Sequence, residues 1–331
     1  MKDRGGLKNI VGKGLLSATI GIAVFAGSAD ISAQAAEELN LYSYRQPFLI
    51  TPLTEAFTAE TGIKVNLVYA KSGVLERLKA EGEHTPADVV LTVDIGRLKD
   101  MVDAGVLAEV SSDLLAEKIP AHLRDPKGLW FGLTQRSRVI FASKDRVPAD
   151  EPLTYEGLAD PKWKGRICFR SGKHDYNVSL IAAMIAHHGL EETRTWLKAV
   201  KANLARKPQG NDRGQAKAIK EGECDLGLGN TYYYGKMATN DDKPEEKSWA
   251  DAVRVVFPNQ KGAGAHMNVS GAGVVKYSQR KETAVRFIEF LVGKKAQTIY
   301  AQQNFEYPVA DGVEVDPVTA ALGAFKADTI S

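Results

Sequence analysis

Residues 39–69 read LNLYSYRQPFLITPLTEAFTAETGIKVNLVY and predict a strand, a helix and a second strand. The first segment, 39–44, is strand-like, and a turn at Arg45-Gln46-Pro47 follows it. Apolar residues then recur at helical spacing until Gly62, a typical helix stop. The alternation over 63–69 returns to the period of a strand.

The same alternation of strands and helices continues along the chain. We expect helices over 74–81 and 96–104 with a strand over 87–92, then an extended segment over 130–143. A second alternation follows. It comprises strands 166–170 and 224–228 and helices 177–188, 193–204, 215–221, 282–292 and 294–304. This pattern favours α/β lobes with a mostly parallel sheet, joined by a hinge with a ligand cleft between them.

Composition excludes several classes of protein. The chain has 331 residues, which favours two domains, and its 44% hydrophobic and 25% charged residues are ordinary for a globular protein. A net charge of +2 does not fit a dedicated nucleic-acid-binding protein. Two cysteines are too few for a zinc ribbon or an iron–sulfur site.

The first 35 residues have the pattern of a secretory signal peptide. Basic residues precede an uncharged apolar run over 14–26, and Ala33-Gln34-Ala35 matches the small-x-small cleavage pattern. The run is shorter than the ~20 residues needed to span a bilayer, and no later stretch approaches that spanning length. We therefore expect residues 1–35 to be removed and the remaining chain to be exported to the periplasm without a membrane span.

Familiar catalytic motifs are missing from the sequence. It contains no G-x-S-x-G elbow and no H-E-x-x-H motif. Gly262-Ala263-Gly264 and Gly271-Ala272-Gly273 lack the third glycine of a dinucleotide-binding fingerprint, and we interpret both as turns. The sequence therefore does not favour an enzyme.

Tyrosines follow two of the predicted strands. Tyr176 comes after the strand over 166–170, and Tyr232-Tyr233-Tyr234 comes after the strand over 224–228. The carboxyl ends of strands in an open α/β sheet face the ligand crevice, so these phenols can converge there. Phenolate oxygen suits a hard trivalent cation such as ferric iron. The residues alone leave a second interpretation open, an aromatic wall that stacks on a sugar or an organic solute.

Four segments resemble the periplasmic ferric-iron-binding proteins, which are the solute receptors of ABC importers. They are YSYRQP over 42–47, PADVVLTVD over 86–94, KPQG over 207–210 and NTYYYG over 230–235. The resemblance covers essentially all of the chain after residue 35. It implies a type II periplasmic-binding-protein fold with an N-terminal lobe over 36–135 plus 267–304 and a C-terminal lobe over 136–266. The tail, 305–331, would pack on the C-terminal lobe.

The resemblance also implies a ligand set for ferric iron. The family's metal-binding tyrosines match Tyr176, Tyr232 and Tyr233. Where some members supply a His-Tyr pair, this chain has Gln46-Pro47, so it looks like the branch that completes the metal shell with a synergistic carbonate. Arg45, Gln46 and Arg136 are the candidate anion contacts, and Arg138 is a weaker one.

The function implied is capture of ferric iron by a monomer that delivers it to a permease and its ATPase in the inner membrane. The resemblance implies no nucleic-acid partner and no catalytic activity. The alternatives are a receptor of the same fold for an oxyanion or a polyamine and, with less support, an α/β transferase. Because the chain is predicted to be exported, we also expect Cys168 and Cys224 to form a disulfide.

Overall fold

The computed structural model describes residues 37–329, so the predicted signal peptide lies outside the described residues. The first part of the chain alternates strands and helices as expected, with boundaries within about two residues of the prediction. Pro47 begins the first helix, where its missing N–H costs no hydrogen bond, and Gly62 ends it in the left-handed conformation, at φ 75°. The elements of this part are β1 (Glu38–Ser43), α1 (Pro47–Thr61), β2 (Lys64–Tyr69), α2 (Val74–Glu81), β3 (Val89–Thr92), α3 (Ile95–Asp103) and α4 (Asp113–Lys118).

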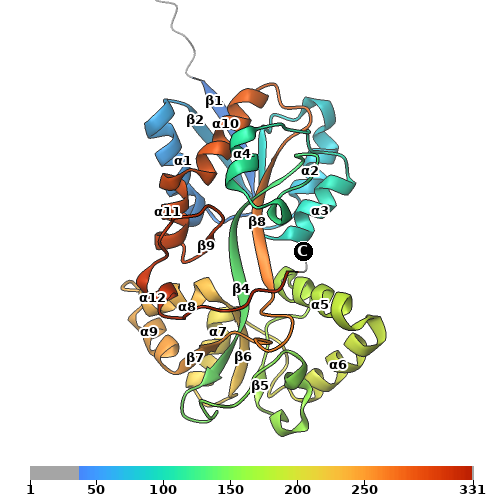
Figure 1. Ribbon diagram of the computed structural model, residues 1–331, viewed down its shortest axis with the longest axis vertical. Coiled ribbons are helices and arrows are strands. Elements are labelled where there is room, and N and C mark those ends of the chain that lie inside the picture. The colour runs from blue at the N-terminus through green and yellow to red at the C-terminus, as the bar shows by residue number, and fades with distance from the viewer. Residues whose placement is uncertain (1–36, 330–331) are drawn as a thin grey trace, which may run out of the picture. The chain divides into compact units, whose positions relative to one another are not determined.

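A long strand, β4 (Phe131–Ser143), leads into the second part of the chain (Figure 1). The helix α4, the helix α9 (Pro244–Asp251) and the strand β7 (Val253–Val256) were not predicted, because each is short and lacks a clear apolar period. The elements of the second part are β5 (Ile167–Cys168), α5 (Asp175–His188), α6 (Leu190–Ala202), α7 (Asp212–Lys220), β6 (Leu226–Asn230), α8 (Thr231–Ala238), α9 (Pro244–Asp251) and β7 (Val253–Val256). The remaining elements are β8 (Met267–Val274), α10 (Lys281–Val292), α11 (Lys294–Gln303), β9 (Tyr307–Pro308) and α12 (Pro317–Ala320).

The strands form a mixed sheet in the order β2-β1-β3-β8-β4-β6-β5, with β7 and β9 also paired to β4. The prediction of a mostly parallel sheet was wrong. Three pairings are parallel, β1 with β2, β1 with β3 and β5 with β6, whereas β4 and β8 pair antiparallel with every neighbour. The reason is that both long strands cross between the two parts of the sheet instead of returning through a helix.

β4 changes partners midway along its length. It pairs with β8 up to Ser137 and with β6 from Arg138 onward. In Figure 1, β1, β2, α1 and α10 lie together near one end of this strand, and β5, β6, β7 and α6 lie around its other end. The change of partner falls close to the boundary predicted between the two lobes, whose exact division stays a prediction.

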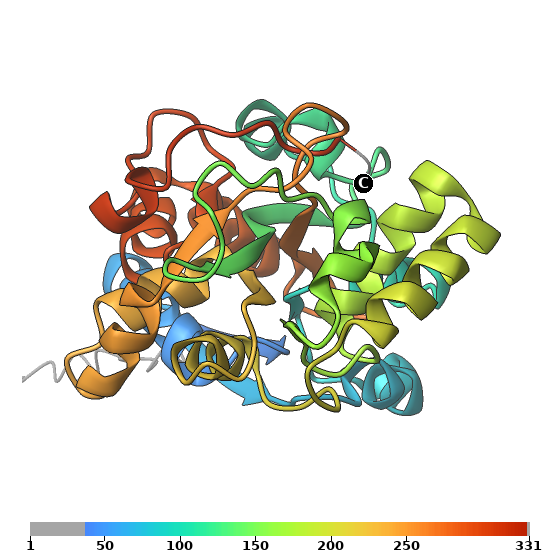
Figure 2. The same cartoon turned by 90° about the horizontal axis from the view of Figure 1, so that it is seen from below.

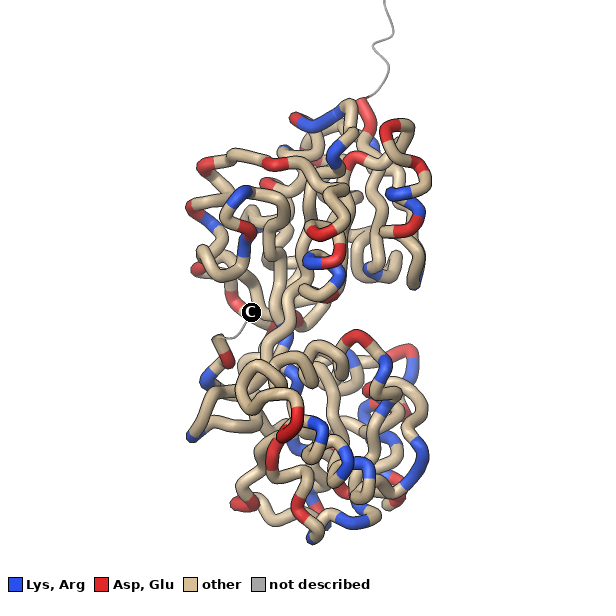
Figure 3. The backbone as a smooth tube through the Cα atoms, turned by 90° about the vertical axis from the view of Figure 1, so that its right-hand side faces the viewer, with Lys and Arg blue, Asp and Glu red and all other residues tan. Residues whose placement is uncertain are grey.

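Hydrophobic clusters lie on both sides of the sheet around β4. Ile140 packs with Leu228 and Trp163 in one cluster, and the next residue, Phe141, packs with Cys168 in another. Neighbouring residues of a strand point to opposite faces, so this part of the sheet is buried on both faces. Seen from below, the helices coloured yellow-green, α5 and α6, and the orange helix, α9, lie on opposite sides of the strands (Figure 2). Acidic and basic residues are interspersed along the backbone (Figure 3).

The tail contacts several elements that are distant in sequence. β9 pairs with β4 at Thr134 and Gln135. Further on, Phe325 stacks on Phe257 with ring centroids 3.9 Å apart, and Ala327 forms a bridge with Ala265. The end of the tail therefore packs on residues of the predicted C-terminal lobe. Its beginning adds the short strand β9 to the sheet beside β4.

The two Gly-Ala-Gly clusters differ in structure, and the interpretation of Gly271-Ala272-Gly273 as a turn was wrong. Gly262 lies in a turn, but Gly271 and Gly273 lie within the buried strand β8. A Cβ atom on Gly273 would meet the carbonyl oxygen of Leu129 at 2.6 Å, and one on Gly271 would meet that of Phe131 at 2.7 Å. These glycines permit close approach of neighbouring backbones.

We expect Gly273→Ala to lower the free energy of unfolding by about 1–3 kcal/mol, because the added methyl group meets backbone that cannot move aside cheaply. Gly262→Ala is the matched control, since the nearest atom to its Cβ is 3.7 Å away. Urea denaturation of both variants measures the difference. Equal midpoints for the two variants would contradict the steric account.

Candidate metal centre

Two helices that begin at the same edge of the sheet carry the predicted tyrosine ligands. Tyr176 is the second residue of α5, and Tyr232 and Tyr233 are the second and third residues of α8. The strands before them, β5 and β6, are parallel neighbours. Their carboxyl ends therefore lie at one edge, as the sequence predicted. The tyrosine triplet lies within the first turn of α8.

The phenols of the three predicted ligands gather in one pocket of about 340 Å³. The hydroxyls of Tyr176 and Tyr232 are 3.0 Å apart, and the rings of Tyr232 and Tyr233 have centroids 4.3 Å apart. Tyr234 points elsewhere and packs beside the cluster that contains Phe141. Its packing is therefore consistent with a ligand set of Tyr176, Tyr232 and Tyr233 that leaves Tyr234 out.

The backbone that positions Tyr176 is fixed by a histidine cap. The Nδ1 atom of His174 accepts a hydrogen bond from the backbone N–H of Tyr176 at 3.3 Å, and the two rings are in edge contact. Burial, together with the neighbouring Arg170, lowers the pKa of His174 to about 4. The imidazole is thus neutral at pH 7 and keeps the free lone pair that this cap needs.

The start of α8 is anchored by a buried carboxylate, Asp212. It accepts hydrogen bonds from Arg138 at 2.6 Å, from Arg170 at 2.7 Å and from the backbone N–H of Asn230 at 2.9 Å. Burial alone would raise the pKa of Asp212, but Arg138 and Arg170 hold it below its ordinary value. Arg138 therefore has a structural role, and it does not line the pocket.

Tyr232 and Tyr233 carry their protons at neutral pH when no metal is bound. Burial and the neighbouring phenols of Tyr176 and Tyr233 raise the pKa of Tyr232 well above 10, although Arg136 opposes the shift. Burial and Tyr176 likewise raise the pKa of Tyr233. Only a strong local positive charge would convert such phenols to phenolates. The cluster is thus suited to a highly charged cation and poorly suited to general acid–base chemistry at pH 7.

Arg136 is a buried cation with unused donors. It lies on β4, is 1% exposed and donates one hydrogen bond, from Nη1 to Ser270 Oγ at 2.7 Å. Its Nε and Nη2 atoms have no hydrogen-bond partner among residues 37–329. A buried guanidinium that lines a pocket with free donors fits an anionic oxygen ligand.

The other two candidate anion contacts also line the pocket, but they differ from Arg136. Arg45 is buried and makes a bidentate pair with Glu306, at 2.9 and 3.0 Å. Its charge is therefore already compensated by a carboxylate. Gln46 is exposed and precedes α1, so its side chain is open to the pocket. The structure thus brings all six predicted site residues to one pocket.

Several residues of this pocket were not predicted, Glu306 and Ser270 among them. Glu306 is 261 positions from its partner Arg45, and Ser270 lies on β8 between Arg45 and Arg136. Neither belongs to a recognisable local motif. An acidic residue in the tail gives no signal of its buried partner, so only the tertiary structure identifies it.

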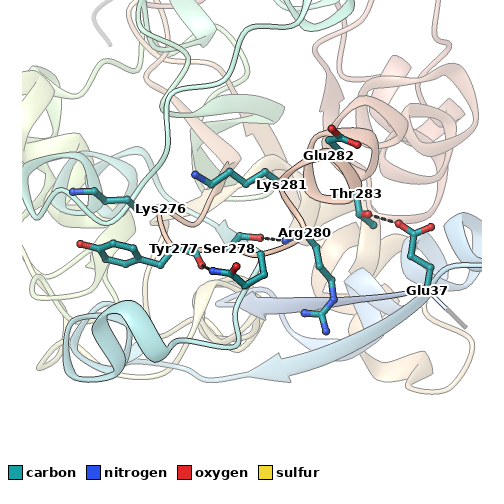
Figure 4. Close-up of a pocket in the computed structure, with 9 residues that line it drawn as sticks. Glu37, Lys276, Tyr277, Ser278, Arg280, Lys281, Glu282 and Thr283 are labelled. Carbon is teal, nitrogen blue, oxygen red and sulfur yellow. Dashed lines mark hydrogen bonds between the residues drawn. The ribbon is translucent and has the colours of Figure 1, made fainter. Parts of the chain in front are cut away.

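A larger cavity, of about 650 Å³, lies elsewhere, around the loop that precedes α10 (Figure 4). Its Arg280 is paired with Glu38 and Asp88, and no tyrosine of the cluster reaches it. Among the described residues, no group of three or more His, Cys, Asp or Glu side chains could hold a metal ion. The tyrosine pocket is therefore the candidate metal centre in the part of the chain that the structure describes.

The predicted disulfide between Cys168 and Cys224 is confirmed. Cys168 ends β5, and Cys224 comes two residues before β6. The bond therefore ties together the two strands whose carboxyl ends lead to the tyrosines.

Comparisons with known proteins agree on one family. Residues 84–324 match the family described as bacterial extracellular solute-binding protein. Iron uptake protein A1 of Synechocystis is 48% identical over 323 residues, which are 97% of this chain and 89% of that protein. Iron uptake protein A2 of the same organism is 43% identical and covers 91% of this chain and 86% of its own length.

Solved structures give the same result. Apo ferric ion-binding protein A of Pasteurella haemolytica superposes with a TM-score of 0.84 and 52% identity, over 89% of this chain and 92% of the other. The Trichodesmium protein IdiA (FutA), solved with iron and citrate, gives a TM-score of 0.83 and 46% identity, over 88% and 92% of the two chains. The expected type II periplasmic-binding-protein fold is confirmed.

Proposed function

Since this chain belongs to the family of bacterial extracellular solute-binding proteins, we propose that its pocket binds ferric iron through Tyr176, Tyr232 and Tyr233. The chain is a ferric-iron-binding receptor that delivers iron to an ABC importer, as its similarity to two iron uptake proteins indicates. Proteins of this family are transport components and not enzymes. The observation that carries the residue assignment is the 3.0 Å approach of the phenols of Tyr176 and Tyr232 inside the pocket.

The charges of three phenolates would balance a trivalent ion. Oxygen ligands of this kind suit a hard cation, and the buried position of Tyr232 keeps water from competing. Binding removes the phenol protons, which the raised pKa of Tyr232 otherwise retains. The metal's own charge drives that deprotonation.

We propose that an anion completes the coordination shell and that Arg136 is its principal contact. The unused Nε and Nη2 donors of Arg136 support this role. Gln46 and Arg45 are the further contacts, on the side of the pocket formed by the residues before α1. Carbonate is the anion that we propose. The Trichodesmium relative was solved with citrate, which also offers carboxylate oxygens to such donors.

Replacing Arg136 by Gln should weaken iron binding about tenfold to a hundredfold, since hydrogen bonds to charged groups contribute about 1.5–3 kcal/mol. Raising the bicarbonate concentration should restore part of the loss by mass action. Competition with a chelator at several bicarbonate concentrations measures both effects. Arg194→Gln, on the exposed face of α6, is the control. An unchanged bicarbonate dependence in Arg136→Gln would remove this residue from the anion site.

Arg45 is less suitable for this test. Its removal would leave Glu306 as a buried, unpaired carboxylate, and breaking such a pair costs about 3–5 kcal/mol of stability. A loss of iron in Arg45→Ala would therefore mix unfolding with loss of the anion.

The family implies an ABC transporter as partner, and the chain is a periplasmic protein like its iron-binding relatives. We propose a monomer that presents iron to a permease and its ATPase in the inner membrane. We also propose that lobes 36–135 plus 267–304 and 136–266 close around the pocket. Among residues 37–329, no helix is both long and apolar enough to cross a membrane.

The alternatives of an oxyanion or polyamine receptor leave three clustered phenols without a role. Titration with ferric iron and bicarbonate distinguishes these alternative receptors from a ferric-iron receptor. We expect a visible phenolate-to-iron charge-transfer band that saturates at one equivalent. A colourless titration without thermal stabilisation would contradict ferric binding at this site.

A further inference from the structure

The pocket that is proposed to take up a cation is itself rich in cations. Two acidic residues, Asp175 and Glu306, line it. The basic residues that line it are Arg45, Lys71, Arg97, Arg136, Arg170, Arg213 and Lys236. The whole chain, by contrast, is nearly neutral, with a net charge of +2. A free ferric ion would thus approach against a positive local field.

Some of these cations are neutralised by carboxylates. Arg45 pairs with Glu306, and Arg97 pairs with Asp175. Arg170 shares the single carboxylate of Asp212 with Arg138. Arg213 is in a looser pair with Glu246, at 3.5 Å. The basic residues that line the pocket still outnumber its acidic residues, so an incoming anion meets a net positive charge.

Two of these cations lie together beside an adjacent chamber. Arg213 and Lys236, with Phe48, line both the metal pocket and a neighbouring cavity of about 580 Å³. The guanidinium of Arg213 lies over the ring of Tyr233, 5.4 Å from its centroid, and its Nε atom is 3.5 Å from the carboxylate of Glu246. The two cations therefore stand between the tyrosines and the second chamber.

Lys236 forms no ion pair with a carboxylate within residues 37–329, and its ammonium donates a hydrogen bond to the backbone carbonyl of Gln303 at 3.0 Å. Burial lowers the pKa of Lys236; the nearby carboxylate of Glu306 opposes this shift, and Arg213 and Arg45 add to it. Its Nζ atom lies 5.5 Å from the ring centroid of Phe48, which is 55% exposed. This combination of a cation without an ion-pair partner and an exposed ring suits a small organic anion.

We propose that the site takes up iron as an anionic chelate, whose outer carboxylate or phenolate groups dock on Arg213 and Lys236 and whose carbon skeleton contacts Phe48. This inference rests on the proposed function and specifies the form in which the substrate arrives. In the exchange that follows, three iron–oxygen bonds to the chelate are replaced by bonds to the three phenolates. The remaining positions are taken by the completing anion or by water. The phenol proton passes to the released chelate oxygen or to water, so charge and atoms balance.

Two small ferric complexes of different charge test the proposal. The first is the trianionic tris-oxalate complex, and the second is the uncharged tris-acetohydroxamate complex. Stopped-flow quenching of tyrosine and tryptophan fluorescence gives the rate constant for loading from each. At low ionic strength we expect the oxalate complex to load at least about tenfold faster. That advantage should shrink toward unity at about 0.5 M salt, where the Debye length is only a few ångströms.

Lys236→Gln and Arg213→Gln should each slow loading from the oxalate complex by about threefold to tenfold. Neither should change the rate for the uncharged complex. Lys198→Gln, an exposed lysine on α6, removes the same charge outside both cavities and should leave both rates unchanged. Circular dichroism confirms that each variant is folded before its rates are compared.

Failure of this inference differs from failure of the proposed function. If the two complexes load at equal rates at low salt, or if the variants slow neither complex, the docking role of Arg213 and Lys236 is overturned while the final iron colour persists. If neither complex produces phenolate colour in the wild-type protein, ferric binding by the tyrosines fails as well.

Discussion

Tyr232→Phe is expected to lose the iron-dependent colour and to bind ferric iron more than about a hundredfold more weakly. Loss of an outer-shell partner already costs about 10–100-fold in metal affinity, and a direct ligand should cost more. Phenylalanine keeps the buried ring and removes only the donor oxygen. Because the hydroxyls of Tyr232 and Tyr176 lie 3.0 Å apart, Tyr176→Phe should have the same effect, as should Tyr233→Phe. Visible titration and competition with a chelator measure colour and affinity.

Tyr234→Phe is the matched control for these variants. It changes the same atom in the same helix, but its ring packs beside the cluster that contains Phe141 and not in the pocket. We expect it to bind iron as the wild-type protein does. If Tyr234→Phe abolished the colour and Tyr233→Phe kept it, the assignment of ligands on α8 would be wrong.

Removing the disulfide should cause the largest loss of stability. The bond between Cys168 and Cys224 closes a loop with a sequence separation of 56. The chain-entropy model gives about 4 kcal/mol for a loop of this length, as an upper figure because strain and residual structure reduce it. We expect the double variant Cys168→Ala, Cys224→Ala to lose most of that free energy of unfolding, measured by urea denaturation.

The iron site should be affected much less than the stability. Cys168 is the last residue of β5, Cys224 precedes β6, and neither cysteine lines the pocket. The folded fraction of the double variant should therefore bind one equivalent of iron with normal colour. A stability loss below about 1 kcal/mol would mean that packing alone holds β5 against β6.

The candidate site could be predicted from the sequence because its key residues follow a general rule of α/β sheets. Tyr176 and Tyr232 each lie in the first turn of the helix that follows a strand. Because the two strands, β5 and β6, lie side by side, the convergence of these residues follows from topology. The family resemblance then distinguished Tyr233 from Tyr234 and added Arg136. These assignments needed no knowledge of distant contacts.

Other features depend on contacts that no local pattern reveals. The pairing of Arg45 with Glu306 joins residues 261 positions apart. Gly271 and Gly273 look like turn residues until the backbone of Phe131 and Leu129 is seen beside them. The mixed character of the sheet has the same origin, because the antiparallel course of β4 and β8 is set by tertiary pairing.

The most direct test of the account is the metal content and visible spectrum of the wild-type protein purified from the periplasm. The account predicts one iron per chain, a phenolate-to-iron charge-transfer band, and loss of both in Tyr232→Phe purified in the same way. Protein that contains no iron and remains colourless after ferric iron and bicarbonate are added would contradict it.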